Sequence, residues 1–388
     1  MTRTSTRSPV GFLEAAMIHS LSRVLFCATA LAALVLAANG AGPKGPRTLE
    51  NLLAKDEPER PPVAGNANNG EFDPANTVAI NEAEARLCLQ HDGTLRFPCL
   101  KNLGPAEARI LASHQHGVAF DGLANIDKPT AAALARCDSH LGLNDIARLD
   151  EPVAEALAKC RGTLELKGLT SLTSPALAKK LAGQGTVHLP NVQTLERDVI
   201  EAFCTAPCDL YLPGLAFLKA HDAKALRRHQ GVLDIDGLVN PPPDVLTWIL
   251  CNQGPIGLGA IRDLGDPAPR EVLNALAGGQ GSLCLNGLQN LTIEEAEAVR
   301  DRRGRTDLDG LEVLDLKTAI VLRDCKSVVS LMGIKVIDPD VVKVLLLRDR
   351  DQGPGLVFSA SLPANLQPHE TKALEDHPGL SIGNEYSP

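Results

Sequence analysis

The chain has 388 residues, a formal net charge of −9 at pH 7, and only 3% aromatic residues within a hydrophobic fraction of 44%. With so few large aromatic side chains, a core must be assembled from many similar small aliphatic layers. The acidic balance disfavours nucleic acid as a partner, because an acidic surface repels phosphate backbones.

Residues 1–40 have the layout of a signal peptide. The apolar run 24–38 follows Arg23, precedes small and polar residues, and is shorter than the roughly 20 residues that span a bilayer. Met17 gives this segment a more ordinary start than Met1 does. The sequence therefore predicts export to a secreted, periplasmic or cell-envelope location, with an uncleaved anchor helix as the alternative interpretation.

Residues 41–80 are rich in Pro, Gly, Asn and charged residues. A segment of this composition cannot bury enough apolar surface to order itself. We therefore expect a disordered linker over 41–80, ahead of a repeat region that covers 81–388.

The repeat region carries a pair of apolar residues, with one residue between them, at intervals of 23 residues. Eight consecutive registers show no slip, and four-residue insertions precede two of the later units. The pairs are Leu95/Phe97, Val118/Phe120, Leu141/Leu143, Leu164/Leu166, Val187/Leu189, Leu210/Leu212, Leu233/Ile235, Ile256/Leu258, Leu283/Leu285, Thr306/Leu308, Val329/Leu331, Leu356/Phe358 and Leu380/Ile382.

Each interval reads as one strand followed by one helix. In the unit that begins at Gly162, alternation predicts that Leu164 and Leu166 point inward, with Leu169 and Leu172 as further inward positions. Helix starts are predicted where a capping residue precedes Pro, and Gly162 and Gly231 are interpreted as left-handed caps that follow helices. Three such starts are Asp127-Lys128-Pro129, Thr173-Ser174-Pro175 and Gly265-Asp266-Pro267.

One strand and one short helix cannot close a core alone, so successive units must stack. The predicted fold class is α/β, a right-handed strand-helix solenoid of about twelve repeats. The period and the pattern Leu164-x-Leu166-x-x-Leu169 resemble the leucine-rich repeat, although Leu169 stands where that family has its ladder Asn. The chain looks most like a bacterial, alanine-rich variant. The resemblance spans 81–388 and implies binding rather than catalysis.

No catalytic motif is recognisable in the sequence, so we expect no enzyme activity and no cofactor. One column of His and Cys recurs at a fixed phase and offers zinc-ligand chemistry. A column of stacked units is too long for one tetrahedral ion, so we interpret these residues as helix-end His and semi-buried Cys. They are His91, His114, Cys137, Cys160, His229 and Cys325.

Nine cysteines follow the signal segment, an odd number for an oxidising compartment. Three pairs are candidate disulfides, and the competing interpretation is that the residues are buried thiols. The pairs are Cys88 with Cys99, Cys137 with Cys160, and Cys204 with Cys208.

Outward strand positions form the candidate binding face, since alternate residues of a strand point to opposite sides. A solvated face without a ligand is the competing interpretation, and the Asp pairs only superficially resemble calcium loops. The outward residues are Asp121, Glu165, Lys167, His188, Tyr211, Asp234, Asp236, Asp307 and Asp309.

The sequence thus predicts a non-enzymatic exported scaffold that binds a protein or a cell-surface polymer through its strand face. One alternative is a structural component of the cell envelope without a discrete ligand. The other alternative is a metal-dependent envelope enzyme that uses the Asp pairs or the His/Cys column.

Overall fold

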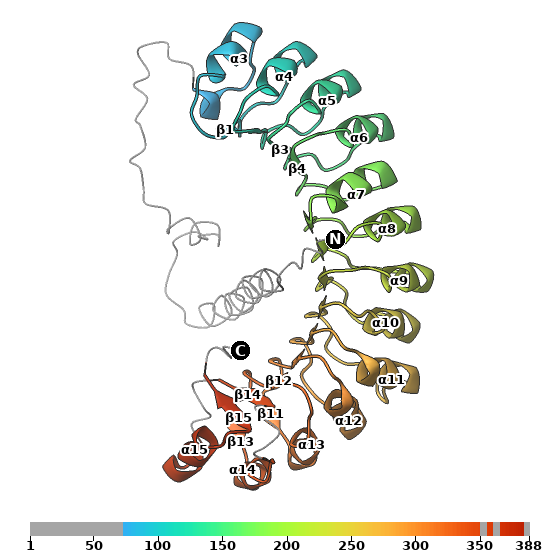
Figure 1. Ribbon diagram of the computed structural model, residues 1–388, viewed down its shortest axis with the longest axis vertical. Helices are drawn as coiled ribbons and strands as arrows, with labels where there is room; N and C mark the ends of the chain where they lie inside the picture. Colours follow the sequence, from blue (N-terminus) through green and yellow to red (C-terminus); the bar gives the residue numbers. More distant parts are fainter. Residues whose placement is uncertain (1–72, 350–354, 360–364, 384–388) are drawn as a thin grey trace, which may run out of the picture. The chain divides into compact units, whose positions relative to one another are not determined.

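A computed structural model of the chain describes residues 73–349, 355–359 and 365–383 (Figure 1). The predicted signal peptide and most of the predicted linker lie outside the described residues. Residues 73–80, which the sequence places in the linker, carry the 3-10 helix η1 (Pro74–Asn76) and a parallel bridge between Ala79 and Asn102. These residues are therefore part of the repeat structure.

Short parallel strands form one layer of the repeat region, and Figure 1 shows them lining one side of the stack. Each has two or three residues, because the chain turns as soon as its two inward side chains are placed. The strands are β1 (Leu95–Arg96), β2 (Val118–Ala119), β3 (His140–Gly142), β4 (Thr163–Glu165), β5 (Thr186–His188), β6 (Asp209–Tyr211), β7 (Leu233–Asp234), β8 (Ile256–Gly257), β9 (Leu283–Cys284), β10 (Thr306–Asp307), β12 (Val329–Ser330), β14 (Leu356–Phe358) and β15 (Leu380–Ile382).

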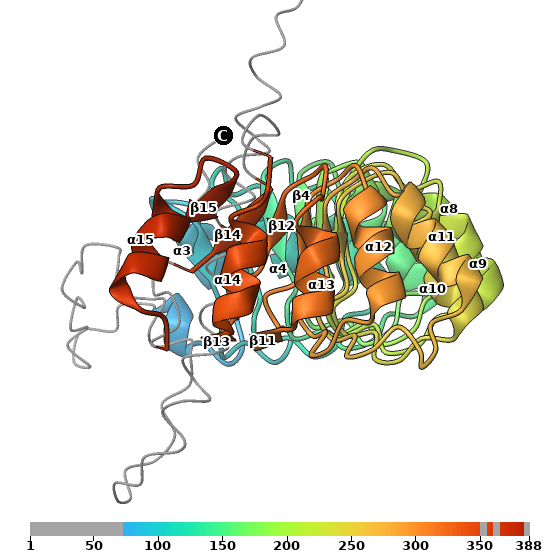
Figure 2. The same ribbon diagram turned by 90° about the horizontal axis from the view of Figure 1, so that it is seen from below.

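Helices form the other layer, and Figure 2 shows α11 to α15 side by side. Among the described residues, no helix combines the length and the apolar character that crossing a membrane requires. The helices are α3 (Glu82–Cys88), α4 (Pro105–Leu111), α5 (Lys128–Leu134), α6 (Glu151–Leu157), α7 (Pro175–Ala182), α8 (Arg197–Phe203), α9 (Ala220–Leu226), α10 (Pro243–Leu250), α11 (Arg270–Gly278), α12 (Ile293–Asp301), α13 (Leu316–Leu322), α14 (Pro339–Leu345) and α15 (Pro368–Glu375).

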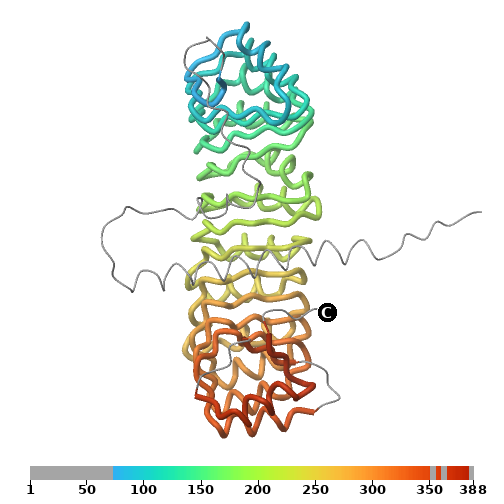
Figure 3. Tube along the Cα trace, turned by 90° about the vertical axis from the view of Figure 1, so that its left-hand side faces the viewer, coloured from blue at the N-terminus to red at the C-terminus, as the bar shows by residue number. Residues whose placement is uncertain are grey.

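The strand register follows the sequence period. Leu95 pairs with Val118, 23 residues later, and the first insertion is absorbed between strands, so that Ile256 pairs with Leu283. Successive turns of the chain lie one above another in Figure 3. The predicted α/β solenoid is therefore confirmed.

The template unit is buried as the alternation predicts. Leu164, Leu166, Leu169 and Leu172 are each at most 3% exposed, while the side chain of Glu165 keeps 39% of its surface in water. Equivalent aliphatic residues from all units form one continuous core between the strands and the helices. Each added unit removes another apolar layer from water, and this burial favours the stack over isolated units.

Local capping signals are confirmed in part. The side chain of Asp127 accepts a hydrogen bond from the Thr130 amide at the start of α5, 2.9 Å away. The predicted start at Asp266 is wrong, because the first four-residue insertion falls there and α11 begins at Arg270. Ser174 precedes α7 as predicted, but its hydroxyl donates to the Glu151 carboxylate instead of capping the helix.

The two glycines interpreted as caps have different reasons for being glycine. Gly231 has a φ of 123°, the left-handed conformation that was predicted. The left-handed interpretation of Gly162 is wrong. A Cβ atom there would lie 1.7 Å from the carbonyl oxygen of Ser139, so Gly162 is required by the close approach of the preceding unit.

The strand layer is interrupted at one place that the period does not reveal. β1 to β4 form a four-stranded sheet, and β5 to β10 with β12, β14 and β15 form a nine-stranded sheet. No ladder joins β4 to β5. At this seam the Gln184 side chain takes the place of a strand: its Oε1 accepts from the Leu164 amide at 2.6 Å, and its Nε2 donates to the Leu164 carbonyl at 3.1 Å. The amide of one side chain therefore satisfies the edge of β4.

A third, two-stranded parallel sheet lies just ahead of α13 and α14. It pairs β11 (Val313–Leu314) with β13 (Val336–Ile337), again 23 residues apart. Asn365 extends this pairing, because its side chain both donates to the Ile337 carbonyl and accepts from the Ile337 amide. Hydrogen bonds thus join neighbouring units in the segments that lead into the helices, as well as in the strand layer.

Candidate functional site

The nine residues predicted for the binding face all lie in the described structure, and none of them is buried. They fall into two groups along the strand layer. Four of the nine, together with His140, which was not predicted, are partly exposed on β3 to β6 and the turn after β4. These five side chains form what we call the mixed-charge cluster: His140, Glu165, Lys167, His188 and Tyr211. The remaining residues are aspartates.

Glu165 is the centre of the mixed-charge cluster. Its carboxylate lies 3.0 Å from the Lys167 ammonium, accepts from the Asn144 amide at 3.3 Å, and lies 3.9 Å from His140 Nε2. Partial burial acts to raise the pKa of Glu165. The hydrogen bond and charge of Lys167, helped by Asn144 and His140, outweigh burial and hold that pKa below its ordinary value. Glu165 is therefore a fixed negative charge at neutral pH.

His188 and Tyr211 extend the cluster onto β5 and β6. Their rings meet edge to face, with centroids 6.2 Å apart. Burial, together with the positive charge of Lys167, lowers the pKa of His188. At neutral pH the cluster therefore presents a neutral imidazole and a phenol beside a lysine-glutamate pair, which is a surface of mixed character and low net charge.

Sequence reasoning missed His140 and Asn144. His140 directly precedes the inward Leu141 of β3, so strand alternation alone could have identified it. Asn144 follows the strand by two residues and becomes significant only through its contacts. It joins three units: it donates to Asp121 at 3.1 Å and to Glu165, and its Oδ1 accepts from the Lys167 amide at 3.2 Å.

Two of the predicted aspartates hold neighbouring units together. Asp236 accepts from the Gly259 amide at 2.6 Å, and Asp309 accepts from the Met332 amide at 2.9 Å, each 23 residues ahead. Asn286 bonds the Asp309 amide in the same way at 3.0 Å. These side chains form an outer ladder, which supplies backbone partners where the turn after each strand leaves amides exposed.

The acidic residues toward the carboxyl end also have nearby partners. Arg305 lies 2.6 Å from Asp307, and the Ser330 hydroxyl donates to Asp309 at 2.6 Å. In the described part of the chain, no three His, Cys, Asp or Glu residues come together as a metal site would require. The resemblance of the Asp pairs to calcium loops therefore has no structural counterpart among these residues.

The His/Cys column forms an inner ladder. Our interpretation of this position as the end of a helix is wrong: α5 ends at Leu134, and Cys137 follows it after a turn. His114 Nε2 lies 3.0 Å from the carbonyl oxygen of His91, and the Cys160 thiol donates to the carbonyl of Cys137 at 3.7 Å. Cys137, His229 and Cys325 instead reach the carbonyls of residues that follow them, His140, Val232 and Gly355. These side chains therefore supply partners for buried backbone groups.

Three further residues continue the inner ladder where it lacks His or Cys. Asn252 donates to the Leu226 carbonyl at 3.0 Å. Arg302, with no measurable exposure, donates to the carbonyls of Leu276 at 3.0 Å and Gly281 at 2.7 Å. Arg348 likewise donates to carbonyls 23 and 25 residues back. Sequence reasoning missed all three, because their residue types differ from those of the column.

The cysteines proposed for disulfides are thiols in the described structure. Burial raises the pKa of Cys88, Cys204 and Cys208 to about 11, so these thiols stay protonated at neutral pH. Burial also raises the pKa of Cys160, which is the thiol that donates within the inner ladder. The three disulfide pairings stay predictions.

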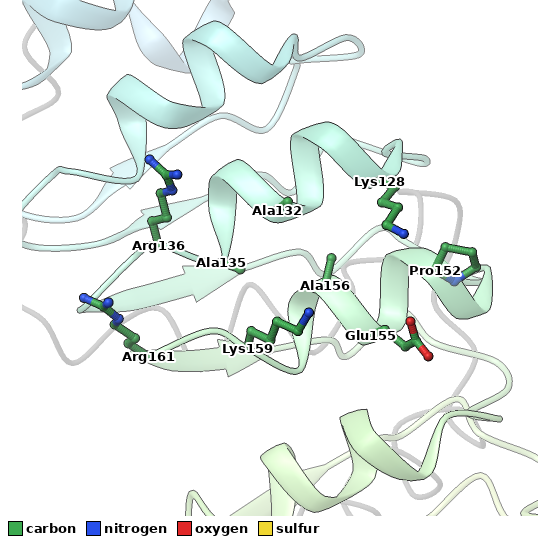
Figure 4. Close-up of a pocket in the computed structure, with 9 residues that line it drawn as sticks. All are labelled: Lys128, Ala132, Ala135, Arg136, Pro152, Glu155, Ala156, Lys159 and Arg161. Atoms are coloured by element: carbon green, nitrogen blue, oxygen red, sulfur yellow. The ribbon is translucent and has the colours of Figure 1, made fainter.

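A shallow groove of about 280 Å³ lies on the helix layer between α5 and α6 (Figure 4). A more open hollow of about 510 Å³ lies among the turns near Lys101 and Asn125. Neither is lined by a nucleophile with a base beside it. The mixed-charge cluster is therefore the candidate site on the strand face, and the groove is a separate feature.

No protein-family model matches the sequence, and no curated protein matches it. Solved structures that are similar to this chain include an internalin and Rad7. An internalin from Listeria monocytogenes has 12% identity and a TM-score of 0.42, over 80% of this chain and 90% of that chain. Rad7, from the yeast Rad7 and Elc1 complex, has 14% identity and a TM-score of 0.30, over 79% of each chain. The repeat fold itself is established by strand pairing and burial within this chain.

Proposed function

We propose that this protein is an exported, non-enzymatic repeat scaffold that recognises another protein through its strand face. The observation that carries the proposal is the mixed-charge cluster, where charged, imidazole and phenol side chains lie partly exposed on adjacent strands. A surface with aromatic groups and complementary charges, held in fixed positions, is typical of protein recognition.

The geometry of the strand layer supports recognition of an extended surface. Strands in a sheet lie about 4.8 Å apart, so the outward side chains of β3 and β4, and those of β5 and β6, are presented at a regular spacing on either side of the seam. The contacts of Asn144 to three units fix this spacing around Glu165. A partner therefore meets a preorganised surface, which lowers the entropy cost of binding.

A cell-surface polymer as the ligand and an envelope component without a discrete ligand are the alternatives on the strand face. The outer ladder favours a structural role for Asp236 and Asp309, since both already bond the next unit. In the mixed-charge cluster, by contrast, the side chains mostly contact one another and not the backbone of the next unit. The cluster therefore favours a discrete protein partner over a purely structural role.

A metal-dependent enzyme is the third interpretation, and the inner ladder argues against the column as its site. His114, Cys137 and Cys160 are almost completely buried, and the polar atoms of the column are directed at main-chain carbonyls. Ligation of a metal would require these groups to give up their backbone partners. We therefore place no catalytic or metal-binding role on the column.

Photo-crosslinking tests the proposed function. A photoreactive residue at Tyr211 of the full-length chain should capture one protein partner in the source cells, while the same residue at the exposed helix-layer position Lys179 should not. The substitutions Lys167→Glu and His188→Glu should abolish capture from position 211. Identical products from both positions, or products unaffected by the two substitutions, would contradict strand-face recognition. A carbohydrate product from position 211 would instead establish the polymer alternative.

A further inference from the structure

The groove between α5 and α6 differs from the rest of this acidic molecule in its charge. Nine residues line it, and Figure 4 shows the long side chains around a low floor of alanines. Four of the lining residues are cationic and only Glu155 is anionic, while the chain as a whole carries a net charge of −9. The cations are Lys128, Arg136, Lys159 and Arg161.

The hollow exists because of one alanine. Ala132 is exposed on α5, at the repeat position where the neighbouring helices α4 and α6 carry the long side chains of Arg109 and Glu155. Ala135 and Ala156 complete the floor and are themselves buried. None of the three side chains extends beyond a methyl group. The longer side chains on either side therefore project above an apolar floor that these alanines form.

The cations are poorly neutralised within the described residues. Arg161 lies 3.7 Å from Asp138, but both side chains are about three-quarters exposed, at 77% and 74%. Exposed pairs of this kind contribute little and exchange readily with other partners. Within the described chain, Lys128, Arg136 and Lys159 make no ion pair. The groove is therefore a positive surface without a matching internal anion.

The arrangement of the cations distinguishes between kinds of anion. Lys128 is the first residue of α5 and Arg136 follows the last residue of α5 by two, so the two cations come from opposite ends of a helix about 10 Å long, too far apart for one small anion to bridge. A long polyanion would meet the negative field of the rest of the chain. A short segment with several carboxylates in succession fits both conditions, since its charges are distributed and its length is limited.

We propose that this groove binds an acidic peptide segment of a protein partner, at a second surface that is independent of the strand face. Carboxylates lie against Arg136 and Arg161 at one end of the groove and against Lys159, whose side chain extends from that end toward Ala156 in Figure 4. A small apolar residue covers the floor at Ala132. At the other end Figure 4 shows Glu155 and Pro152 with Lys128 beside them, so the positive charge of Lys128 is offset there by Glu155.

Fluorescence anisotropy with a labelled peptide of several glutamates followed by alanines tests the proposal on the purified full-length chain. Wild-type protein should bind the peptide, and Arg136→Glu with Lys159→Glu should weaken binding by about tenfold or more, because two attractions become repulsions. Lys179→Glu with Lys219→Glu is the matched control: it changes the net charge equally, at exposed residues outside the groove. This control should bind nearly as well as wild type.

A substitution that leaves the charge unchanged tests the contribution of the alanine floor to peptide binding. Ala132→Leu fills the groove at an exposed position, so the fold is retained and peptide binding should be lost; a circular-dichroism melt verifies the fold. Equal weakening by both charge-reversal pairs, or unchanged binding by Ala132→Leu, would show nonspecific attraction and overturn the proposal. Complete competition by millimolar inorganic phosphate would also overturn it, in favour of a small-anion site. None of these results depends on the strand face, so they are distinguishable from failure of the proposed function.

Discussion

Arg302 is the most informative residue for testing the inner ladder. It is fully buried, it has no acidic partner among the described residues, and its guanidinium donates to the carbonyls of Leu276 and Gly281. Burial lowers its pKa to about 10, which still leaves it charged at neutral pH. The Leu276 carbonyl also accepts from the Gly279 amide at 3.3 Å, so the Gly281 carbonyl is the one that depends on Arg302. A buried charge is tolerated where it supplies the donor that a buried carbonyl needs.

The substitution Arg302→Ala should lower the free energy of unfolding by about 3–5 kcal/mol. The Gly281 carbonyl loses its Arg302 donor at about 1–3 kcal/mol, and the Leu276 carbonyl loses one of two donors. A cavity adds to this cost, and release from charge burial offsets part of it. Arg302→Met keeps most of the volume and should cost less than Arg302→Ala. Arg303→Ala, at the exposed neighbouring position, is the control and should stay within about 0.5 kcal/mol of wild type.

Urea denaturation followed by far-ultraviolet circular dichroism measures these differences. Gly279 adds a second check, because a Cβ there would lie 1.7 Å from an Arg302 nitrogen. Gly279→Ala should be destabilising in the wild-type chain and close to neutral alongside Arg302→Ala. If Arg302→Ala cost no more than Arg303→Ala, the argument that the column satisfies the backbone would be refuted.

Three further predictions concern other parts of the chain. Burial lowers the pKa of His229, so below about pH 6.5 the unfolded chain takes up a proton that the folded chain resists. The free energy of unfolding should therefore fall on acidification, and the fall should be smaller in His229→Asn. Thermal melts of both proteins at two pH values measure this difference. Gln184→Ala should leave the Leu164 amide without its partner, and hydrogen exchange should show that amide exchanging much faster than in wild type. Export predicts that amino-terminal sequencing of the mature protein begins near Ala41.

The predictions in this group have separate contradicting outcomes. A wild-type melting temperature that does not change between neutral and mildly acidic pH would show that His229 does not govern the response. Unchanged exchange at Leu164 would mean that the main chain of the next unit, and not Gln184, protects β4. Protein recovered from the cytosol with an intact Met1 or Met17 would contradict export.

Residue-level expectations succeeded where the relevant contact is local or repeats with the period. Leu164 and Leu166 are buried and Glu165 faces outward, because alternation along a strand is a property of the backbone itself. Expectations failed where an insertion displaced a local signal, as at Asp266 ahead of α11. They also failed at Gly162, which is required by the neighbouring unit and not by its own backbone angles.

The sequence by itself determined the repeat, its period and its two layers, because each unit must bury the same aliphatic positions and can do so only against another copy of the pattern. Tertiary structure alone decided the ladders, the seam and the groove. Arg302 and Gln184 bond residues 20 or more positions earlier in the chain, and Ala132 lines a groove with residues of the following helix. Such contacts depend on how two unlike units are offset when they stack, and no periodicity within one unit records that offset.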